Sequence, residues 1–418
     1  MPKFDDYEEA VTGITAGYAF NDGIEPKVPY SFMGAIYDED EREMLLSVLD
    51  QEALTMGPQV SAFEREFAEY SGVKHAFATT SCTTAMHIAT QAMGIGEGDE
   101  VILTPNTFIA TTLAILKEGG IPIYADIDPR TYNIDPAEVA KKVTEKTKAI
   151  YVVHYGGQVC DMDPIMEIAR EHGLYVLEDC AHAHGSEYKG QKAGSIGDFG
   201  CFSFLSLKNM TLGEGGMITT NRDDMVEGIT LMRNMNIGEW EEKGPEYWLP
   251  SHFDVVEYLG KWGVNYRMTE FQAAVGRCQL RKLEDMVAAR IENGRYLNEG
   301  LKDVDGYIVP WEDGRGRMSY HLYTLCVDPE KLDRDDVMRD IYYKQQCTQG
   351  ILHYEPNYRF TAVAKYLADR GYGGQECPIA EKFFYKQEFN LPMNPRLTKE
   401  DLDIMIEGLT LAAERCRK

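Results

Sequence analysis

The chain of 418 residues has little that would suit a membrane or secreted protein. It has no apolar run of the roughly 18 residues that a membrane-spanning helix needs. Its N-terminal residues, MPKFDDYEEAVTGITAGYAF, are acidic and interrupted, unlike the apolar core of a secretory signal. We therefore expect a cytoplasmic protein that makes no contact with a membrane.

The sequence also lacks the cysteine patterns that are typical of disulfides and zinc sites. The nine cysteines are Cys82, Cys160, Cys180, Cys201, Cys278, Cys326, Cys347, Cys377 and Cys416. Their number is odd and no two are spaced as CxxC, which argues against a disulfide framework and a zinc knuckle. His182 and His184 do not have the spacing of a histidine metal motif, so we expect no metal site.

Basic residues are scarce in the chain, and the glycine motif of nicotinamide-binding enzymes is missing. Lys and Arg total 42 against 68 Asp and Glu, a formal charge of -26, so a nucleic-acid partner is not expected. The chain has no internal repeat and no GxGxxG motif that opens a helix, which disfavours a nicotinamide-binding Rossmann enzyme.

What the sequence does have is a regular alternation of apolar strand-like runs and amphipathic helical segments between residues 75 and 221. This rhythm predicts an α/β fold with a largely parallel central sheet. A long helix is expected over about 269–300. Beyond it, strand-like pieces at 321–328 and 349–354 and a terminal helix capped by Thr398 predict a second, smaller α/β region. The expected division is an N-terminal extension (1–30), a large domain (31–285) and a small domain (286–418).

Three features follow predicted strands, where ligands of parallel sheets bind. The sequence Ser81-Cys82-Thr83 opens a helix and suits a phosphate, although it also suits a simple cap. Asp179 ends a strand, where it could cap, bind metal or hold a cationic ring nitrogen. Lys208 lies between an apolar run and a glycine-rich turn. Together these residues match pyridoxal phosphate: a lysine that forms a Schiff base with the aldehyde, an aspartate at the pyridine nitrogen, and a phosphate site.

Longer motifs carry a family resemblance from about Val28 to Arg415. They include LEDCAHAHGSEYKGQKAGSIGDFGCFSF, LKNMTLGEGGMITTN and GVNYRMTEFQAAVG. The chain resembles the DegT-like sugar aminotransferases, which are fold-type I pyridoxal phosphate enzymes. The resemblance implies a three-layer αβα domain with a mostly parallel sheet, plus a smaller C-terminal α/β domain. It also implies pyridoxal 5'-phosphate, with pyridoxamine phosphate as its intermediate form, and a homodimer with active sites at the subunit interface.

The resemblance implies roles for individual residues around the cofactor ring. Lys208 would form the Schiff base and act as catalytic acid and base, and Asp179 would partner the ring nitrogen. Phe108, where relatives often have Trp, would stack on the ring, and it keeps a flat apolar face. His182 would reach the 3-oxygen region of the cofactor.

Four further residues are implied around the phosphate. Cys82, Thr83 and Ser203 would hold it within one subunit. Relatives often have Gly or Ala at the position of Cys82, but the implied contact is through the backbone amide. Asn265 would reach the phosphate from the other subunit, and its alternative reading is an ordinary turn residue before a helix.

The implied activity is the transfer of an amino group from L-glutamate or glutamine to a keto sugar, typically a nucleotide-linked 3- or 4-keto-deoxy sugar in amino-sugar biosynthesis. Relatives that dehydrate sugars have His in place of Lys208, so the lysine favours transamination. Other pyridoxal chemistry and a non-catalytic regulator on the same scaffold are the alternatives. The expected sugar-facing residues are His321, Tyr323, His353 and Tyr354, while the carrier nucleotide and the ring carbon cannot be read from the sequence.

Overall fold

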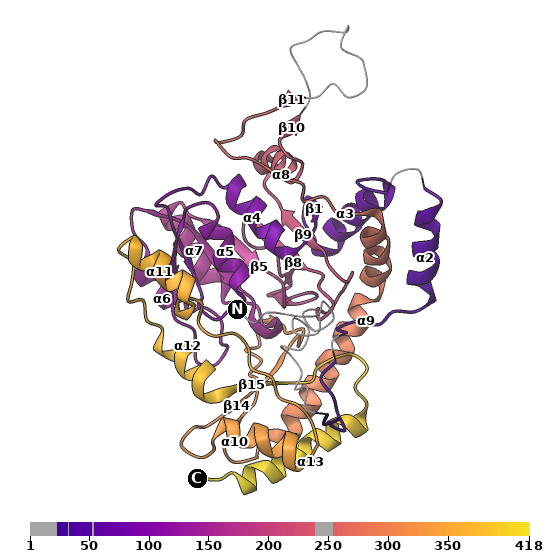
Figure 1. Cartoon of the computed structure of the whole chain (residues 1–418), viewed down its shortest axis with the longest axis vertical. Helices are drawn as coiled ribbons and strands as arrows, with labels where there is room; N and C mark the ends of the chain where they lie inside the picture. Colours follow the sequence, from indigo (N-terminus) through magenta and orange to yellow (C-terminus); the bar gives the residue numbers. More distant parts are fainter. Residues whose placement is uncertain (1–22, 32, 52–53, 239–253) are drawn as a thin grey trace, which may run out of the picture.

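The computed structural model describes residues 23–31, 33–51, 54–238 and 254–418. Figure 1 shows a large domain built on one broad sheet, a smaller domain beside it, and a long helix that runs from one to the other. Among the described residues, no helix has the length and apolar character needed to cross a membrane.

The large domain contains a seven-stranded sheet in the order β1-β9-β8-β5-β4-β2-β3. Its strands are β1 (His75–Thr79), β2 (Glu100–Leu103), β3 (Ile121–Tyr124), β4 (Thr147–Val153), β5 (Tyr175–Asp179), β8 (Phe199–Ser203) and β9 (Gly216–Thr220). The run from β8 to β3 is parallel, and β9 is antiparallel to both of its neighbours. The prediction of a mostly parallel sheet is confirmed.

Helices cover both faces of this sheet because successive strand residues point to opposite sides. In β4, Ala149 and Tyr151 join the core beneath α4, α5 and α8, whereas Ile150 and Val152 join the core beneath α3, α6, α7 and the long helix α9 (Glu270–Leu301). The large-domain helices are α2 (Glu39–Leu49), α3 (Pro58–Ser71), α4 (Cys82–Ala92), α5 (Ile109–Leu116), α6 (Pro136–Lys142), α7 (Met162–His172) and α8 (Val226–Arg233). This arrangement confirms the three-layer αβα fold.

The long helix α9 (Glu270–Leu301) connects the two domains, and a capping box of Thr269 with Gln272 fixes where it begins. The small domain packs a three-stranded antiparallel sheet against this helix and against α13. Its elements are β12 (Tyr307–Ile308), β14 (Tyr323–Val327), β15 (Glu388–Leu391), α10 (Arg334–Arg339) and α13 (Lys399–Arg415). Thr398 caps α13 as predicted. The expected boundary at 285/286 falls inside α9.

Part of the expected small domain packs on the large one. The segment 357–383 carries α11 (Thr361–Asp369) and α12 (Pro378–Lys382), which lie beside α5 and α6 in Figure 1. The side chains of Val363 and Leu367 complete the core beneath α4 and α5. This segment was expected within the domain 286–418, and its amphipathic helices are instead buried against the sheet domain.

The remaining short strands form two small sheets at the edges of the molecule. They are β6 (Glu187–Tyr188), β7 (Gln191–Lys192) and β13 (Gly316–Arg317) in one, and β10 (Ile237–Gly238) and β11 (Asp254–Val255) in the other. The predicted strand at 349–354 is wrong. Within this segment only Ile351 forms an isolated bridge, with Asn390. The segment does not continue along the sheet, because its residues 351–354 line a cavity beside Lys208.

Candidate active site

Lys208 lies in the loop between β8 and β9, and the sequence around it determines this position. The buried strand residues before it end at Ser203, and the turn is closed by hydrogen bonds that include Lys208 N to Leu205 O at 2.8 Å. The side chain is half-buried. Desolvation lowers the pKa of Lys208 to about 8, although the nearby Asp179 and Cys82 oppose this shift. The lysine is therefore a better nucleophile at neutral pH than an ordinary solvated lysine.

Asp179 ends β5, a strand in the middle of the parallel sheet, so its carboxyl is buried at the site edge. One carboxyl oxygen accepts the Thr111 hydroxyl at 2.8 Å, and the other accepts the Ala181 amide at 3.1 Å. Burial raises the pKa of Asp179, while these donors and the Lys208 ammonium oppose the rise. A cationic group placed beside this carboxyl would favour its ionised form.

The N-terminus of α4 lies next to these two groups. Ser81 caps the helix through a capping box with Thr84, so Cys82 and Thr83 occupy its first turn. The Cys82 thiol points inward, 3.4 Å from the Cys201 carbonyl and 3.9 Å from Asp179. A helix N-terminus presents backbone N–H groups and a partial positive charge, which together suit a phosphate.

A glycine allows the end of β9 to approach this helix. A Cβ atom on Gly216 would lie 2.3 Å from the Ser81 carbonyl group, closer than any side chain tolerates. Gly216 also pairs with Ser203, which brings the serine at the end of β8 to the same edge as the helix start. Cys82, Thr83 and Ser203 are thus brought together, as the phosphate prediction requires.

Aromatic rings lie around the mouth of this site. Phe108 precedes α5 with 49% of its surface exposed, and its ring centroid is 5.0 Å from that of Tyr354. His182 follows β5 and is buried, with its ring 4.4 Å from that of His321. Burial and the Lys208 charge hold the pKa of both histidines well below the usual range, so both are neutral at pH 7.

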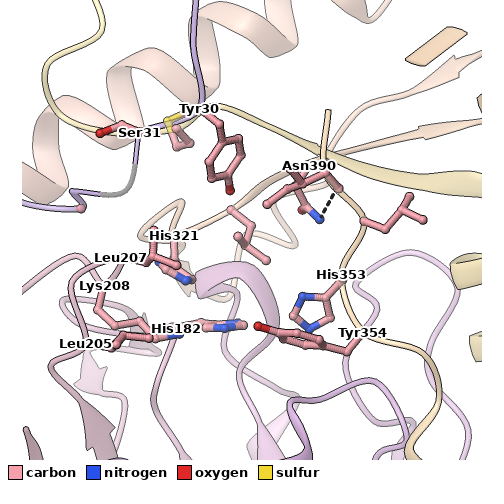
Figure 2. Close-up of a pocket in the computed structure, with 15 residues that line it drawn as sticks. Tyr30, Ser31, His182, Leu205, Leu207, Lys208, His321, His353, Tyr354 and Asn390 are labelled. Carbon is pink, nitrogen blue, oxygen red and sulfur yellow. Dashed lines mark hydrogen bonds between the residues drawn. The ribbon is translucent and has the colours of Figure 1, made fainter. Parts of the chain in front are cut away.

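A cavity lies between the two domains directly above Lys208 (Figure 2). The large domain contributes Lys208, His182 and the flanking Leu205 and Leu207. The opposite wall comes from the small domain and from the N-terminal segment: Tyr30, Ser31, Gly34, His321, Leu322, Ile351, Leu352, His353, Tyr354, Asn390 and Met393. The cavity thus combines a nucleophilic amine with several hydrogen-bonding side chains.

Comparison with known proteins identifies the family that has this arrangement. A sequence model of the DegT/DnrJ/EryC1/StrS aminotransferase family matches residues 35–410. The chain belongs to this family. It is 37% identical over 375 residues to a GDP-perosamine synthase of Caulobacter vibrioides, a match that covers 89% of this chain and 95% of the relative. It is 34% identical over 375 residues to a dTDP-3-amino-3,6-dideoxy-alpha-D-galactopyranose transaminase of Aneurinibacillus thermoaerophilus, covering 89% and 95%.

Solved structures agree with the fold and the cofactor. An aminotransferase of Streptococcus pneumoniae, determined in its pyridoxal phosphate form, superposes with a TM-score of 0.82 at 25% identity. The match covers 92% of this chain and 98% of that one, and the same protein is also known in its pyridoxamine phosphate form. The chain is therefore a pyridoxal phosphate-dependent sugar aminotransferase of fold type I.

The residues of this family member fit the cofactor. A buried carboxyl, a lysine of lowered pKa and a helix N-terminus converge at one edge of the sheet. Lys208 would hold the aldehyde, Asp179 the ring nitrogen, and the first turn of α4 with Ser203 the phosphate. The ring contacts of Phe108 and His182 stay predictions: His182 lines the cavity with Lys208, and the Phe108 ring lies beside that of Tyr354. Asn265 is exposed, and its side chain accepts the Arg267 amide at 3.3 Å.

Three of the four expected sugar-facing residues line the cavity, namely His321, His353 and Tyr354. Tyr323 does not. It is fully buried in the small-domain core and donates its hydroxyl to Asn298 at 2.9 Å. Both His321 and Tyr323 were expected to face the sugar because they lie in one segment that resembles a part of the family's cleft. The strand begins only at Tyr323, and a positive φ of 48° at Tyr320 breaks the alternation before it.

Sequence reasoning missed Tyr30 and Asn390. Tyr30 lines the cavity but belongs to none of the motifs that carried the resemblance, and the match to the family model begins only at residue 35. Asn390 lies on β15, where its side chain accepts the Thr324 hydroxyl at 2.6 Å and donates to Glu388 at 3.1 Å. The alternation in Glu388–Leu391 was the available signal, since Glu388 and Asn390 share one strand face.

The adjacent Glu178 has a structural role. Its carboxyl accepts the backbone N–H groups of Gly194, Ile196 and Gly197 at 2.7–2.9 Å, and it bonds the His154 ring at 2.9 Å. Glu178, His154 and Cys180 are close enough to resemble a metal site. Because these hydrogen bonds already use both carboxyl oxygens, we assign the cluster to holding the loop before β8.

Proposed function

We propose that this enzyme transfers the amino group of L-glutamate, or of L-glutamine, to a nucleotide-linked 3- or 4-keto-deoxy sugar in amino-sugar biosynthesis. The single observation that carries this proposal is the Lys208 amine, with its lowered pKa, at the base of a cavity with hydrogen-bonding walls. The names of the relatives support the choice of substrate class, because one is a synthase of GDP-perosamine and the other a transaminase of a dTDP-linked amino-dideoxy sugar.

Pyridoxal phosphate, when bound, supplies an aldehyde that exchanges amino groups and a ring that accepts electrons from the reacting carbon. The chain's own groups supply the proton transfers. Lys208 Nζ would take the proton from the α-carbon of the donor in the first half-reaction. In the second, the same nitrogen would deliver a proton to the sugar carbon that receives the amino group.

The neighbours of Lys208 prepare it for this task. Desolvation leaves a larger fraction of the amine unprotonated near neutral pH than in a solvated lysine, and a general base must be unprotonated. The neutral His182 and His321 rings can donate or accept hydrogen bonds without adding charge beside the lysine. Asp179 would keep the ring nitrogen protonated as long as its own carboxyl is ionised.

We further propose that the enzyme acts as a homodimer. Asn265 is exposed and precedes the long helix α9, so a second copy of the chain could bring it to the phosphate. A measurement of mass in solution tests the dimer. Mixing Lys208→Ala with Asn265→Ala protein tests the sharing of residues, since hybrid dimers would regain one complete site.

The experiment that tests the function follows the absorbance of the purified holoenzyme. L-glutamate should convert the spectrum of the pyridoxal form into that of the pyridoxamine form, and Lys208→Ala should abolish this conversion. A nucleotide keto sugar should then restore the original spectrum. A holoenzyme whose spectrum glutamate and glutamine both leave unchanged would contradict the proposed donors.

A further inference from the structure

Part of the cavity wall comes from a segment that begins before residue 35, where the match to the family model starts. We call residues 27–31 and 33–36 the N-terminal strap. Its first part pairs with the small domain, where Lys27 N and Val28 N each donate to main-chain carbonyls of 346–347 at 2.9 Å. The Thr348 hydroxyl donates to Val28 O at 2.9 Å. The strap therefore begins as part of the small-domain surface.

The second part of the strap is attached to the catalytic loop. Gly34 N donates to Ser206 O at 2.8 Å, and a Cβ atom on Gly34 would lie 2.1 Å from Lys208 O. Only glycine permits such contact between the strap and the backbone of the catalytic lysine. Between its two attachments, the strap crosses one side of the cavity.

A buried arginine connects the strap to the small-domain part of the wall. Arg290 of α9 is fully buried and donates to Gly34 O at 2.6 Å and to Met393 O at 2.8 Å. Since Gly34 and Met393 both line the cavity, this one guanidinium fixes the strap relative to the small-domain part of the same wall. The position of the strap is thus fixed by the folded protein, as a binding wall requires.

Tyr30 lies between these attachments and lines the cavity. Figure 2 shows its hydroxyl end directed into the space bounded by His321, His353 and Asn390, facing Lys208 across the cavity. A phenol can donate or accept a hydrogen bond, and its ring offers a flat apolar surface. These properties suit the hydroxyl groups and the C–H face of a sugar ring better than the carboxylates of glutamate.

We propose that Tyr30 contacts the sugar ring of the substrate and helps to determine which sugar the enzyme accepts. This proposal rests on the proposed function and deepens it. The relatives are named for different sugars, yet the family model begins at residue 35. A wall contributed by residues outside that matched region is a suitable place for selectivity that differs among members.

The test compares the two half-reactions. Wild type, Tyr30→Phe and Tyr30→Ala holoenzymes are mixed with L-glutamate and, to run the sugar half-reaction backwards, with GDP-perosamine or dTDP-3-amino-3,6-dideoxy-α-D-galactopyranose. We expect the glutamate rate to stay within about twofold. For the amino sugar, kcat/KM should fall about tenfold in Tyr30→Phe and further in Tyr30→Ala. Tyr343→Ala, an exposed tyrosine outside the cavity, is the matched control.

Binding without turnover gives a second readout. In a Lys208→Ala background, calorimetry measures the affinity for the same amino sugar and for glutamate. Adding Tyr30→Phe should lower the affinity for the amino sugar about tenfold and leave the affinity for glutamate unchanged, because the lost hydroxyl contacts only the sugar. The intact glutamate response also shows that the variants are folded.

The outcomes separate this proposal from the proposed function. If Tyr30→Phe lowers the rate with glutamate and the rate with the amino sugar equally, or lowers neither, the role of Tyr30 in sugar recognition is overturned. A wild type that reacts with glutamate but with neither amino sugar would contradict the proposed sugar class and remove the basis of the inference. A wild type that reacts with both, and a selective loss in Tyr30→Phe, would support it.

Discussion

The two parts of the site differ in origin. The catalytic floor, where Asp179, Lys208 and the start of α4 lie near one another, is formed at the ends of strands of the large-domain sheet, and of these groups Lys208 lines the cavity. The wall around His353 and Asn390 comes from the small domain, and Tyr30 comes from the strap. A reaction common to the family requires the same catalytic side chains at the floor, whereas substrates of different shape require different side chains in the cavity wall. The floor is therefore the side that sequence motifs reveal, and the wall is the side that only contacts reveal.

The largest effect should come from Asp179 at the floor. Asp179→Asn keeps the shape but removes the charge that would hold a protonated ring nitrogen, so kcat/KM should fall by about 10³-fold. Steady-state kinetics with a saturating donor measures this loss. Asp369→Asn, an exposed change on α11, is the matched control and should leave kcat/KM unchanged. A loss below about fivefold in Asp179→Asn would remove this residue from the catalytic floor.

The neighbouring acid should affect stability. Glu178→Gln replaces one carboxyl oxygen by an amide NH2 group, which leaves either the Gly194 N–H or the N–H groups of Ile196 and Gly197 facing another donor. Buried unsatisfied donors should lower the free energy of unfolding by about 2–3 kcal/mol. Urea unfolding measures this free energy. In the control Glu299→Gln, a change at an exposed residue, it should stay within about 0.5 kcal/mol of the wild-type value. Equal stability of both variants would contradict the scaffolding role.

The pKa of Lys208 predicts how the apoenzyme captures its cofactor. Only the neutral amine attacks an aldehyde, so the capture rate should rise about tenfold per pH unit below pH 8 and level off above it. Stopped-flow absorbance with pyridoxal phosphate measures this profile. A plateau that is reached only near pH 10.5, the ordinary lysine value, would show that burial does not lower the pKa.

The smallest effect should come from Tyr323 in the small-domain core. Tyr323→Phe removes one hydrogen bond to Asn298, so the free energy of unfolding should fall by about 1 kcal/mol while KM for either substrate stays the same. Thermal unfolding and steady-state kinetics measure the two quantities. A raised KM for the sugar without loss of stability would return Tyr323 to the cavity wall. Tyr30→Phe is the comparison, because it should impair the reaction with the sugar without a matching loss of stability.

Prediction from the sequence succeeded where local pattern decides the structure. Apolar runs predicted Asp179 at the end of a strand and Lys208 after one, and Thr398 was predicted as the cap of the terminal helix. It failed where the deciding partner is distant. The segment 349–354 has a strand-like composition, but it lies at the cavity and forms only one bridge. The segment 357–383 gives no sequence signal that its apolar side chains are buried on the large domain.

The sequence by itself determined the family, the cofactor and the floor of the site, because each depends on short motifs whose residues follow one another along the chain. The tertiary structure alone decided the wall. It brings Tyr30 beside His353 and Asn390, and it anchors the strap through a hydrogen bond between residues 320 positions apart. It also directs Tyr323 into the core. The physical reason is that contacts between distant segments depend on how two domains and one buried arginine pack, which no local periodicity encodes.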